Sequence, residues 1–355
     1  DRVTFAMMLA VPLMQLMLFG YAINNDPKHL PAALVAPTQD RFTRAMVSAL
    51  ELTGYYDFRY PTASATEAEM LMARGKVAFV VTVPSDFGQR VERGDDPQIL
   101  IEADATDPSV ASGAISTLGT VAADALLRET GGEAEASARA ASQLSVVVHR
   151  RYNPEGITQY NIVPGLMGVI LTLTMVLMTG LAMTRERERG TFENLLATPA
   201  TPVEVMTGKI VPYILIGLIQ VVLILAAARW LFDVPMHDSL LLLFAVVLLF
   251  ICANLTLGIT FSSIARNQLQ AMQMTIFFFM PSLLLSGFMF PFRGMPEWAQ
   301  VVGNVLPLTH FLILVRGILL KGNGIDMIWP HTWPILLFTG AVLAFGLKTF
   351  RKTLD

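Results

Sequence analysis

Hydrophobic and polar positions divide the chain into long apolar runs, one mixed segment and one dense polar loop. The apolar runs cover residues 3–23, 159–183, 206–230, 239–264, 269–290 and 333–347. A helical run of about 20 residues, at 1.5 Å per residue, crosses a hydrocarbon core of roughly 30 Å. The pattern therefore predicts a polytopic α-helical membrane protein with six transmembrane helices, the first within residues 1–23 and the others within residues 158–355.

The segment between the first two runs, residues 24–157, alternates short strand and helix patterns. Strand patterns occur at residues 32–36, 56–60, 77–83, 98–104 and 144–150, and helix patterns at residues 40–53, 66–74, 86–93 and 108–129. They predict a compact α/β domain inserted between the first two spans. The segment has no nucleophile elbow, zinc-ligand spacing or dinucleotide glycine pattern, so we expect a binding or docking module.

A few polar residues of this segment are candidates for a functional site. Asp104 and Asp107 flank a turn before a predicted helix, where capping is expected rather than metal binding. His149, followed by Arg150 and Arg151, is expected at the junction of the domain with the membrane rather than in a catalytic role.

A polar loop, Arg185–Lys209, separates the second and third spans with the sequence RERERGTFENLLATPATPVEVMTGK. It must lie in water at a membrane face, because each charge at the bilayer centre costs roughly 2.5 to 3.5 kcal/mol. Thr191 is placed to cap a short helix that Pro199 ends, and a capping box from Thr201 begins the next span. We expect a short stiff helix within residues 185–204, lying along the membrane face.

The apolar segment at residues 298–320 is ambiguous. It contains several polar or helix-breaking residues, namely Asn304, Pro307, His310 and Arg316. If it crossed the membrane fully, the basic residues within 348–352 would share a side with residues 24–157. If it dips in and returns, they share the side of the polar loop, as the positive-inside rule requires. We therefore predict a re-entrant external segment at residues 291–320, with both chain ends cytoplasmic and residues 24–157 extracytoplasmic.

Composition agrees with a membrane protein. Of the 355 residues, 54% are hydrophobic and 15% are charged, whereas an average soluble domain carries about 25% charged residues. The net charge of −3 argues against nucleic acid as a partner. Cys252 is the single cysteine and lies in an apolar run, so no disulfide can form within one chain.

The sequence contains no pattern for binding ATP, because G-x-x-x-x-G-K-[ST] does not occur in it. The triplet Leu285–Ser286–Gly287, which resembles a fragment of an ATPase signature, falls inside a predicted span and is expected to be a helix-packing patch. Any energy for transport must therefore come from a partner protein.

The polar groups deep in the predicted spans are amides. They are Gln15, Gln220, Asn254, Gln270 and Gln273. A proton or sodium carrier would need acids or histidines at mid-membrane. Each amide either bonds helix to helix or faces a substrate, and amides beside soft Met and Phe surfaces suit varied amphipathic molecules. The substrate-path candidates are Asn254, Gln270, Gln273, Met274, Phe277 and Phe278.

The polar loop resembles the first cytoplasmic loop of the ABC-2 type transporter permeases, in which R-E-x-E-x-G-T-x-E-x-L-x-x-T-P precedes P-x-E-x-x-x-G-K. A second stretch, SGFMFPFRGMPEWAQVVGNVLPLTHFLILVRGILLKG, is similar to the pattern that forms a broken external helix pair in that family. The resemblance covers the membrane part. The large insertion fits the subgroup that resembles bacterial multidrug-efflux permeases.

The resemblance implies that residues 185–204 form a coupling helix that docks on a separate ABC ATPase subunit. The residues implied in this coupling are Glu186, Arg187, Glu188, Arg189, Gly190, Thr191, Glu193, Leu195, Leu196, Thr198 and Pro199. The charged residues would fix the position of this helix on the ATPase through salt bridges, and Leu195 and Leu196 would form the apolar contact with the ATPase. ATP and Mg²⁺ would bind to the ATPase, and this chain is expected to hold no cofactor or metal.

The expected function is that of the membrane-spanning permease subunit of an ABC exporter, not an enzyme, which moves drugs or lipid-like amphipathic molecules outward. A second permease subunit, identical or a paralogue, would complete a dimer in the bacterial inner (plasma) membrane. Membrane lipids are further expected partners, and the external domain is a candidate surface for a periplasmic adaptor protein. Two alternatives stay open: a mechanotransmitting ABC subunit that drives a periplasmic partner, and a ligand-binding membrane sensor.

Overall fold

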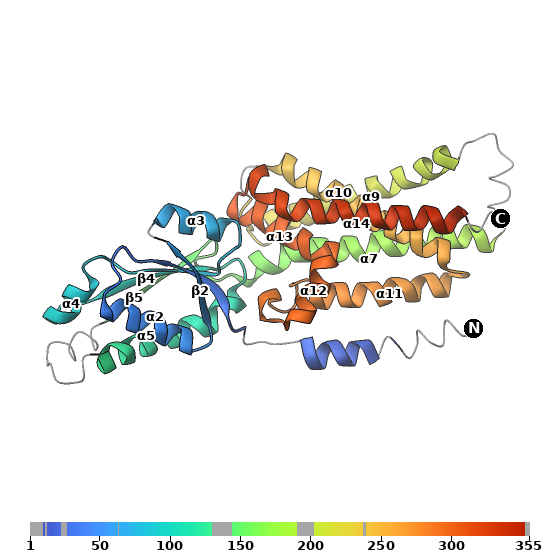
Figure 1. Ribbon diagram of the computed structural model, residues 1–355. Helices are drawn as coiled ribbons and strands as arrows, with labels where there is room; N and C mark the ends of the chain where they lie inside the picture. Colours follow the sequence, from blue (N-terminus) through green and yellow to red (C-terminus); the bar gives the residue numbers. More distant parts are fainter. Residues whose placement is uncertain are drawn as a thin grey trace. The chain divides into compact units, whose positions relative to one another are not determined.

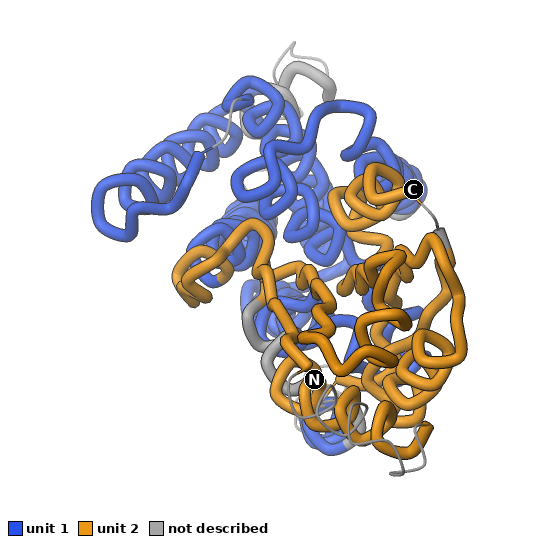
Figure 2. The backbone as a smooth tube through the Cα atoms, turned by 90° about the vertical axis from the view of Figure 1, so that its left-hand side faces the viewer, with its two compact units in different colours: residues 1–23, 162–355 blue, residues 24–161 orange. Residues whose placement is uncertain are grey.

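The computed structural model describes residues 10, 13–22, 27–62, 64–129, 144–189, 202–236 and 239–351. The chain forms two compact units (Figure 2). One is an α/β unit, Asn24–Asn161, and the other is a helical unit made of Asp1–Ile23 and Ile162–Asp355.

The α/β unit is built on one five-stranded sheet with the strand order β2-β1-β3-β4-β5. The strands are β1 (Leu30–Val35), β2 (Tyr56–Thr62), β3 (Phe79–Thr82), β4 (Gln98–Asp104) and β5 (Ser145–Arg151). Neighbouring strands are parallel except for β3 and β4, which are antiparallel. The alternation of short strands and helices in the sequence therefore corresponds to a mostly parallel sheet with crossover helices.

Four helices cover the sheet: α2 (Arg41–Leu52), α3 (Ala65–Ala73), α4 (Phe87–Arg93) and α5 (Pro108–Glu129). Figure 1 shows α3 on one face and α2 and α5 on the other. Because successive side chains of a strand point to opposite faces, Ala32 of β1 packs in the core with α2, α4 and α5, while Ala33 packs in the core with α3.

Local signals in the sequence explain where these helices begin. The Asp40 side chain accepts a hydrogen bond from the Thr43 amide at 2.7 Å and caps α2, and Ser64 caps α3 through the Glu67 amide at 3.3 Å. Such caps satisfy amides that have no partner within the helix.

The polar residues at the C-terminal ends of β4 and β5 are paired within the α/β unit. Asp104 accepts hydrogen bonds from the Thr106 amide at 3.1 Å and hydroxyl at 2.7 Å, both within the turn before α5. Capping of α5 by Asp104 or Asp107 stays a prediction. Arg151 pairs with Glu102 on β4 at 2.7 Å and with Glu69 on α3 at 3.1 Å. These contacts tie the edge strand β5 to its neighbours.

The helical unit consists of long helices and one bent pair (Figure 1). Residues 13–17 are helical and continue into η1 (Leu18–Ala22). The other elements are α7 (Thr158–Glu188), α9 (Pro202–Trp230), α10 (Leu240–Ile264), α11 (Gln268–Leu285), η2 (Phe292–Gly294), α12 (Glu297–Val305), α13 (Pro307–Lys321) and α14 (Ile325–Arg351).

Five of the described helices are long and apolar enough to cross a membrane: Thr158–Glu186, Ile210–Trp230, Leu240–Ile264, Gln268–Leu285 and Ile325–Gly346. The pair α12 and α13 raises the number to six if it counts as one broken span. Of the predicted first span, the structure describes residue 10 and residues 13–22. The architecture is therefore that of a membrane-like helical protein, and the number of spans stays a prediction.

Two predicted helix ends are wrong. The fifth span ends at Leu285 instead of near residue 290, because the chain turns at Gly287, which has a positive φ of 81°. A Cβ there would lie 3.0 Å from the Phe292 Cβ. The triplet from Leu285 is thus a helix end rather than a patch inside a span. The last helix begins at Ile325, not near residue 333, and includes Pro330 and Pro334.

The bend between α12 and α13 measures 83° and follows the predicted break at Pro307. Two side chains of the first turn of α13 complete it. The Thr309 hydroxyl donates to the Gly303 carbonyl at 2.7 Å, and the His310 Nε2 lies 2.8 Å from the Asn304 carbonyl. These carbonyls are in the last turn of α12, where a helix leaves such groups without partners.

Glycines allow the long helices to approach closely. A Cβ at Gly258 of α10 would lie 2.8 Å from the Val176 carbonyl oxygen and 2.9 Å from the Thr179 Cβ, both on α7. A Cβ at Gly168 of α7 would lie 2.8 Å from side-chain atoms of Phe311 on α13. Small residues at such contacts are typical of helix packing in membranes.

Candidate functional site

The polar loop joins α7 to α9, and the structure describes its two ends. Helix α7 extends to Glu188, and α9 begins at Pro202, where the capping box predicts it. Seven of the predicted coupling residues lie outside the described residues: Gly190, Thr191, Glu193, Leu195, Leu196, Thr198 and Pro199. The side chain of Arg187 is likewise not described, so the coupling role of this loop stays a prediction.

The described end of the loop is bonded to another helix. The Glu188 carboxylate accepts a hydrogen bond from the Gln268 backbone amide at 2.8 Å, and its second oxygen accepts one from the Gln268 side chain. These bonds, the side-chain bond first, hold the pKa of Glu188 below its usual range. Since Gln268 is the first residue of α11, the last residue of α7 is tied to the start of α11.

Gln270, a predicted substrate-path residue, lies in the same turn. Its side-chain oxygen accepts a hydrogen bond from the Arg266 backbone amide at 2.8 Å, and its backbone amide donates to the Asn267 side-chain oxygen at 2.8 Å. The residue is only 4% exposed. These contacts support a structural role in shaping the turn between α10 and α11.

Two other predicted amides have a buried oxygen for which the described residues offer no hydrogen-bond donor. They are the Oδ1 atom of Asn254 in α10 and the Oε1 atom of Gln273 in α11. The Asn254 amide nitrogen donates to the Phe250 carbonyl at 2.8 Å. By contrast, Gln220 of α9 accepts a hydrogen bond from Thr174 of α7 at 3.0 Å, so it is a helix-to-helix contact.

The apolar path candidates of α11 point in different directions. Phe278 packs against Phe261 of α10 and Phe338 of α14, with ring centroids 6.0 and 6.3 Å apart. Phe277 is 41% exposed, and Met274 is half-buried. Sequence periodicity grouped these residues on one helix, and the contacts divide them between its interior and exterior sides.

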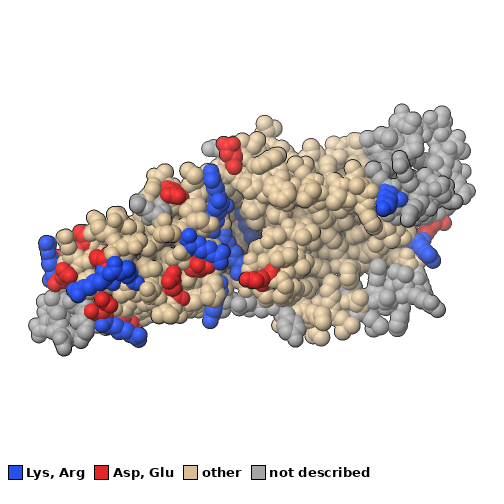
Figure 3. Space-filling view, in the orientation of Figure 1, with Lys and Arg blue, Asp and Glu red and all other residues tan. Residues whose placement is uncertain are grey.

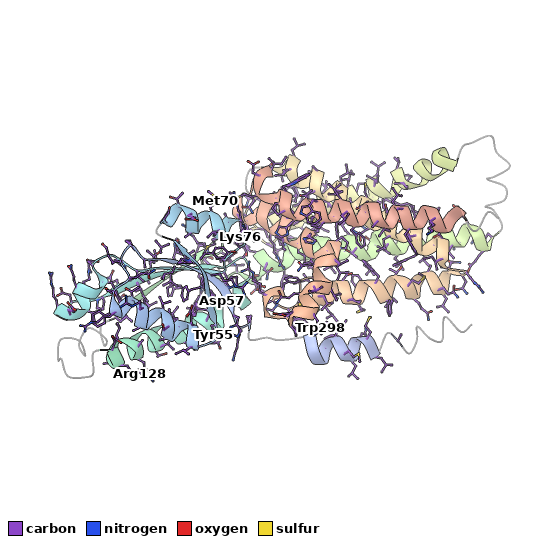
Figure 4. All side chains as sticks on the ribbon, viewed as in Figure 1. Tyr55, Asp57, Met70, Lys76, Arg128 and Trp298 are labelled. Carbon is purple, nitrogen blue, oxygen red and sulfur yellow. The ribbon has the colours of Figure 1, made fainter. Side chains whose placement is uncertain are left out.

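The exposed side of α11 lines an apolar groove of about 660 Å³. Trp298 of α12, which Figure 4 labels, is one of the residues that line it. The groove is lined by Ala10, Leu13, Met14, Met17, Leu18, Phe277 and Trp298. All of these side chains are apolar, so the groove suits a hydrocarbon surface.

A histidine pair, which sequence reasoning did not find, joins α13 to α14. The His310 Nδ1 lies 3.2 Å from the His331 Nδ1. Because the His310 Nε2 donates to the Asn304 carbonyl, the neutral ring of His310 accepts at Nδ1 and His331 donates. For His310, the sequence signal was Thr309 and His310 two and three residues after the helix-breaking Pro307, in position to satisfy the preceding helix end.

Among the described residues, no group of three or more His, Cys, Asp or Glu side chains is arranged to hold a metal ion. In the view of Figure 3, charged side chains gather on the α/β unit, and the visible face of the helical unit is largely uncharged. A bundle of apolar helices, joined by a polar loop and containing buried amides, is the architecture of a multi-pass membrane protein.

The sequence matches the family described as "ABC-2 family transporter protein" over residues 2–348, and the chain belongs to this family. It is 29% identical to "Probable multidrug ABC transporter permease YbhS" of Escherichia coli (strain K12), covering 99% of this chain and 92% of that protein. It is 25% identical to "Probable multidrug ABC transporter permease YbhR" of the same strain, over 98% and 94%. It is 30% identical to "Inner membrane transport permease YhhJ", over 82% and 77%.

Membership of this family makes the chain a permease subunit of an ABC transporter, which is not itself an enzyme. It also implies an ABC ATPase as partner and pairing with a second permease.

Proposed function

We propose that this chain is the permease subunit of an ABC exporter that moves drugs or lipid-like amphipathic molecules outward across a bacterial inner membrane. ATP and Mg²⁺ bind to the separate ATPase subunit. The names of the relatives YbhS and YbhR as multidrug permeases support this substrate class.

The pair of buried amide oxygens, Asn254 Oδ1 and Gln273 Oε1, is the observation that carries the proposal. A buried polar atom without a partner costs about 1 to 3 kcal/mol, so a folded protein retains one where it has a use. A passing molecule that has a hydrogen-bond donor and an apolar body satisfies such an oxygen. The neighbouring Met274 and Phe277 offer soft surface to the apolar body.

Energy enters through residues 185–204, which contact the ATPase. The charged residues Glu186 to Arg189 and Glu193 set the registry, and Leu195 and Leu196 form the apolar contact. Motion of this segment rocks α7 and α9, which it joins. In this arrangement both chain ends are cytoplasmic, residues 24–157 are extracytoplasmic, and the α/β unit is available to a periplasmic adaptor protein.

The proposal is tested by removing one buried oxygen. Gln273→Met keeps the side-chain volume and removes the unpaired polar atom, so we expect thermal stability in detergent to stay equal or rise. ATP-driven transport of rhodamine 6G, an amphipathic probe with N–H donors, should fall about fivefold or more.

The matched control is Gln220→Met, which removes an amide that is already paired with Thr174. This change should lower thermal stability and leave the rank order of transported probes intact. Unchanged rhodamine 6G transport by Gln273→Met, together with a loss of stability, would count against a substrate-facing role.

A second candidate function is mechanotransmission to a periplasmic partner, favoured by the length of α7. This helix runs without interruption from Thr158 to Glu188, about 46 Å at 1.5 Å per residue. In the sequence it follows the last strand of the α/β unit, which ends at Arg151, and it ends in the polar loop. ATP-dependent changes in proteolysis of residues 24–157, without transport of any probe, would favour this alternative.

A further inference from the structure

The bond between α7 and α11 is not explained by docking on an ATPase. Glu188 lies in the stretch assigned to ATPase contact, yet its carboxylate is directed at Gln268 within the same subunit. The two residues are 80 positions apart in the sequence. The contact therefore joins the start of the polar loop to α11, which is not one of the two helices that flank the loop.

A carboxylate is well suited to the start of α11. The first amides of a helix have no partner within it, and the helix dipole places partial positive charge there. Asn267 satisfies the Gln270 amide, and Glu188 satisfies the Gln268 amide. Helix α11 is therefore capped jointly by its own N-cap residue and by the last residue of α7.

The same end of α7 is also held against α10. The Thr184 hydroxyl donates to the Ser262 hydroxyl at 3.2 Å, and Gly180 and Gly258 pack so closely that a Cβ at Gly258 would lie 3.3 Å from the Gly180 amide nitrogen. A displacement of the end of α7 is thus resisted by contacts with two helices. Through Glu188, it also acts on α11.

We propose that Glu188 is a positioning residue that ties the end of α7 to the first turn of α11, so that both helices follow one motion of residues 185–204. The inference rests on the proposed function, because α11 carries Gln273, Met274 and Phe277. A stroke of the ATPase then moves these residues directly, in addition to the two helices that flank the loop.

A double-mutant cycle between Glu188 and Gln268 separates this role from ATPase docking. The measured quantity is the number of rhodamine 6G molecules transported per ATP hydrolysed, in the permease reconstituted with its ATPase. Glu188→Gln should lower this ratio about fivefold, because the negative charge of Glu188 beside the N-terminus of α11 is lost. Gln268→Glu should lower it further, since two carboxylates then meet. The double variant, Glu188→Gln with Gln268→Glu, restores one carboxylate to the pair and should recover at least half of the wild-type ratio.

Docking alone predicts a different pattern. If Glu188 serves only as an ATPase contact, Gln268→Glu has little effect and the double variant behaves like Glu188→Gln. That result would overturn the inference. ATPase co-purification should stay at the wild-type level for Gln268→Glu, because Gln268 lies on α11 outside the polar loop. Equal thermal stability of the three variants shows that folding is intact.

A cross-link tests the same contact without any transport measurement. In a Cys252→Ser background, Glu188→Cys and Gln268→Cys should form a disulfide with equal yield in the nucleotide-free complex and in the complex trapped with ATP and vanadate. A yield that falls several-fold in either state would show that α7 and α11 separate during the cycle, contradicting the proposal. If wild-type protein transports no probe, the proposed function fails, while the cross-linking result still decides whether the two helices move together.

Discussion

The two units bury their residues in different ways, although one chain forms both. In the α/β unit, Phe42 and Met46 of α2 are almost fully buried, and charged residues such as Arg151 are paired at the edge of the sheet. In the helical unit, large apolar residues such as Leu241, 85% exposed, lie outside, while amides lie inside. In water, burial of apolar surface stabilises the fold of the first unit. In lipid, close packing and hydrogen bonds between helices stabilise the fold of the second.

The largest expected effect comes from the same substitution made in each unit. Phe42→Ala empties a site that is 1% exposed and should cost about 3 to 5 kcal/mol of α/β-unit stability, measured by urea unfolding in mild detergent. Phe345→Ala, at a residue 56% exposed on α14, should change stability by less than about 0.5 kcal/mol. Equal losses would contradict the exposed position of Phe345 on the outside of the helical unit.

Close helix packing is tested next, at Gly258. Gly258→Val places side-chain atoms against the α7 backbone at Val176, so it should cost about 1 to 3 kcal/mol and lower the thermal midpoint of the helical unit. Gly340→Ala is the control, because a Cβ at Gly340 has no neighbour within 4 Å. An unchanged midpoint for Gly258→Val would contradict the close approach of α7 and α10.

Loss of the Thr309–Gly303 hydrogen bond at the α12–α13 bend has a smaller expected effect. Thr309→Val removes one of two donors to the Gly303 carbonyl, the other being the Leu306 amide, and should cost about 1 kcal/mol in thermal unfolding. Thr332→Val is the control, because the Thr332 hydroxyl donates to the Ile328 carbonyl one turn earlier within α14. That carbonyl lies inside a continuous helix, where the backbone ladder supplies a donor, so the change should cost less. The reverse order would show that the bend does not depend on Thr309.

An alkaline dependence of the stability of the α/β unit is also expected, and it has no effect at neutral pH. Burial raises the pKa of Tyr152 to about 12, above its usual value of 10.0. The unfolded chain therefore ionises Tyr152 at a lower pH than the folded protein does. The contribution of Tyr152 to folding stability is complete below pH 10 and is lost as the pH rises toward 12. Tyr152→Phe should flatten this part of the stability profile, measured by urea unfolding at several pH values. A profile identical to that of the wild type would rule out this contribution of Tyr152.

Local signals predicted the α/β elements well. Strand β4 and helix α5 have the predicted bounds, and capping residues such as Asp40 marked helix starts. These elements depend on alternation and on residues next to them in the sequence. The end of α11 was misplaced because a positive φ at Gly287 stops the helix while the apolar run continues.

The candidate site was less predictable for a physical reason. The loop and the break at Pro307 are sequence features, but the Glu188–Gln268 and His310–His331 contacts join residues far apart in the chain. The sequence also does not tell which amides are paired, because Gln220 and Gln273 occur in similarly apolar surroundings. Only the packed helices distinguish them.

The most direct test of the account is ATP-driven movement of an amphipathic probe in liposomes that contain the permease and its ATPase. With ATP on the side of the ATPase, we expect rhodamine 6G or a fluorescent phospholipid to move toward the side that bears residues 24–157, and Gln273→Met to slow the movement of rhodamine 6G. ATP hydrolysis at the full rate with no movement of either probe would contradict the proposed export function.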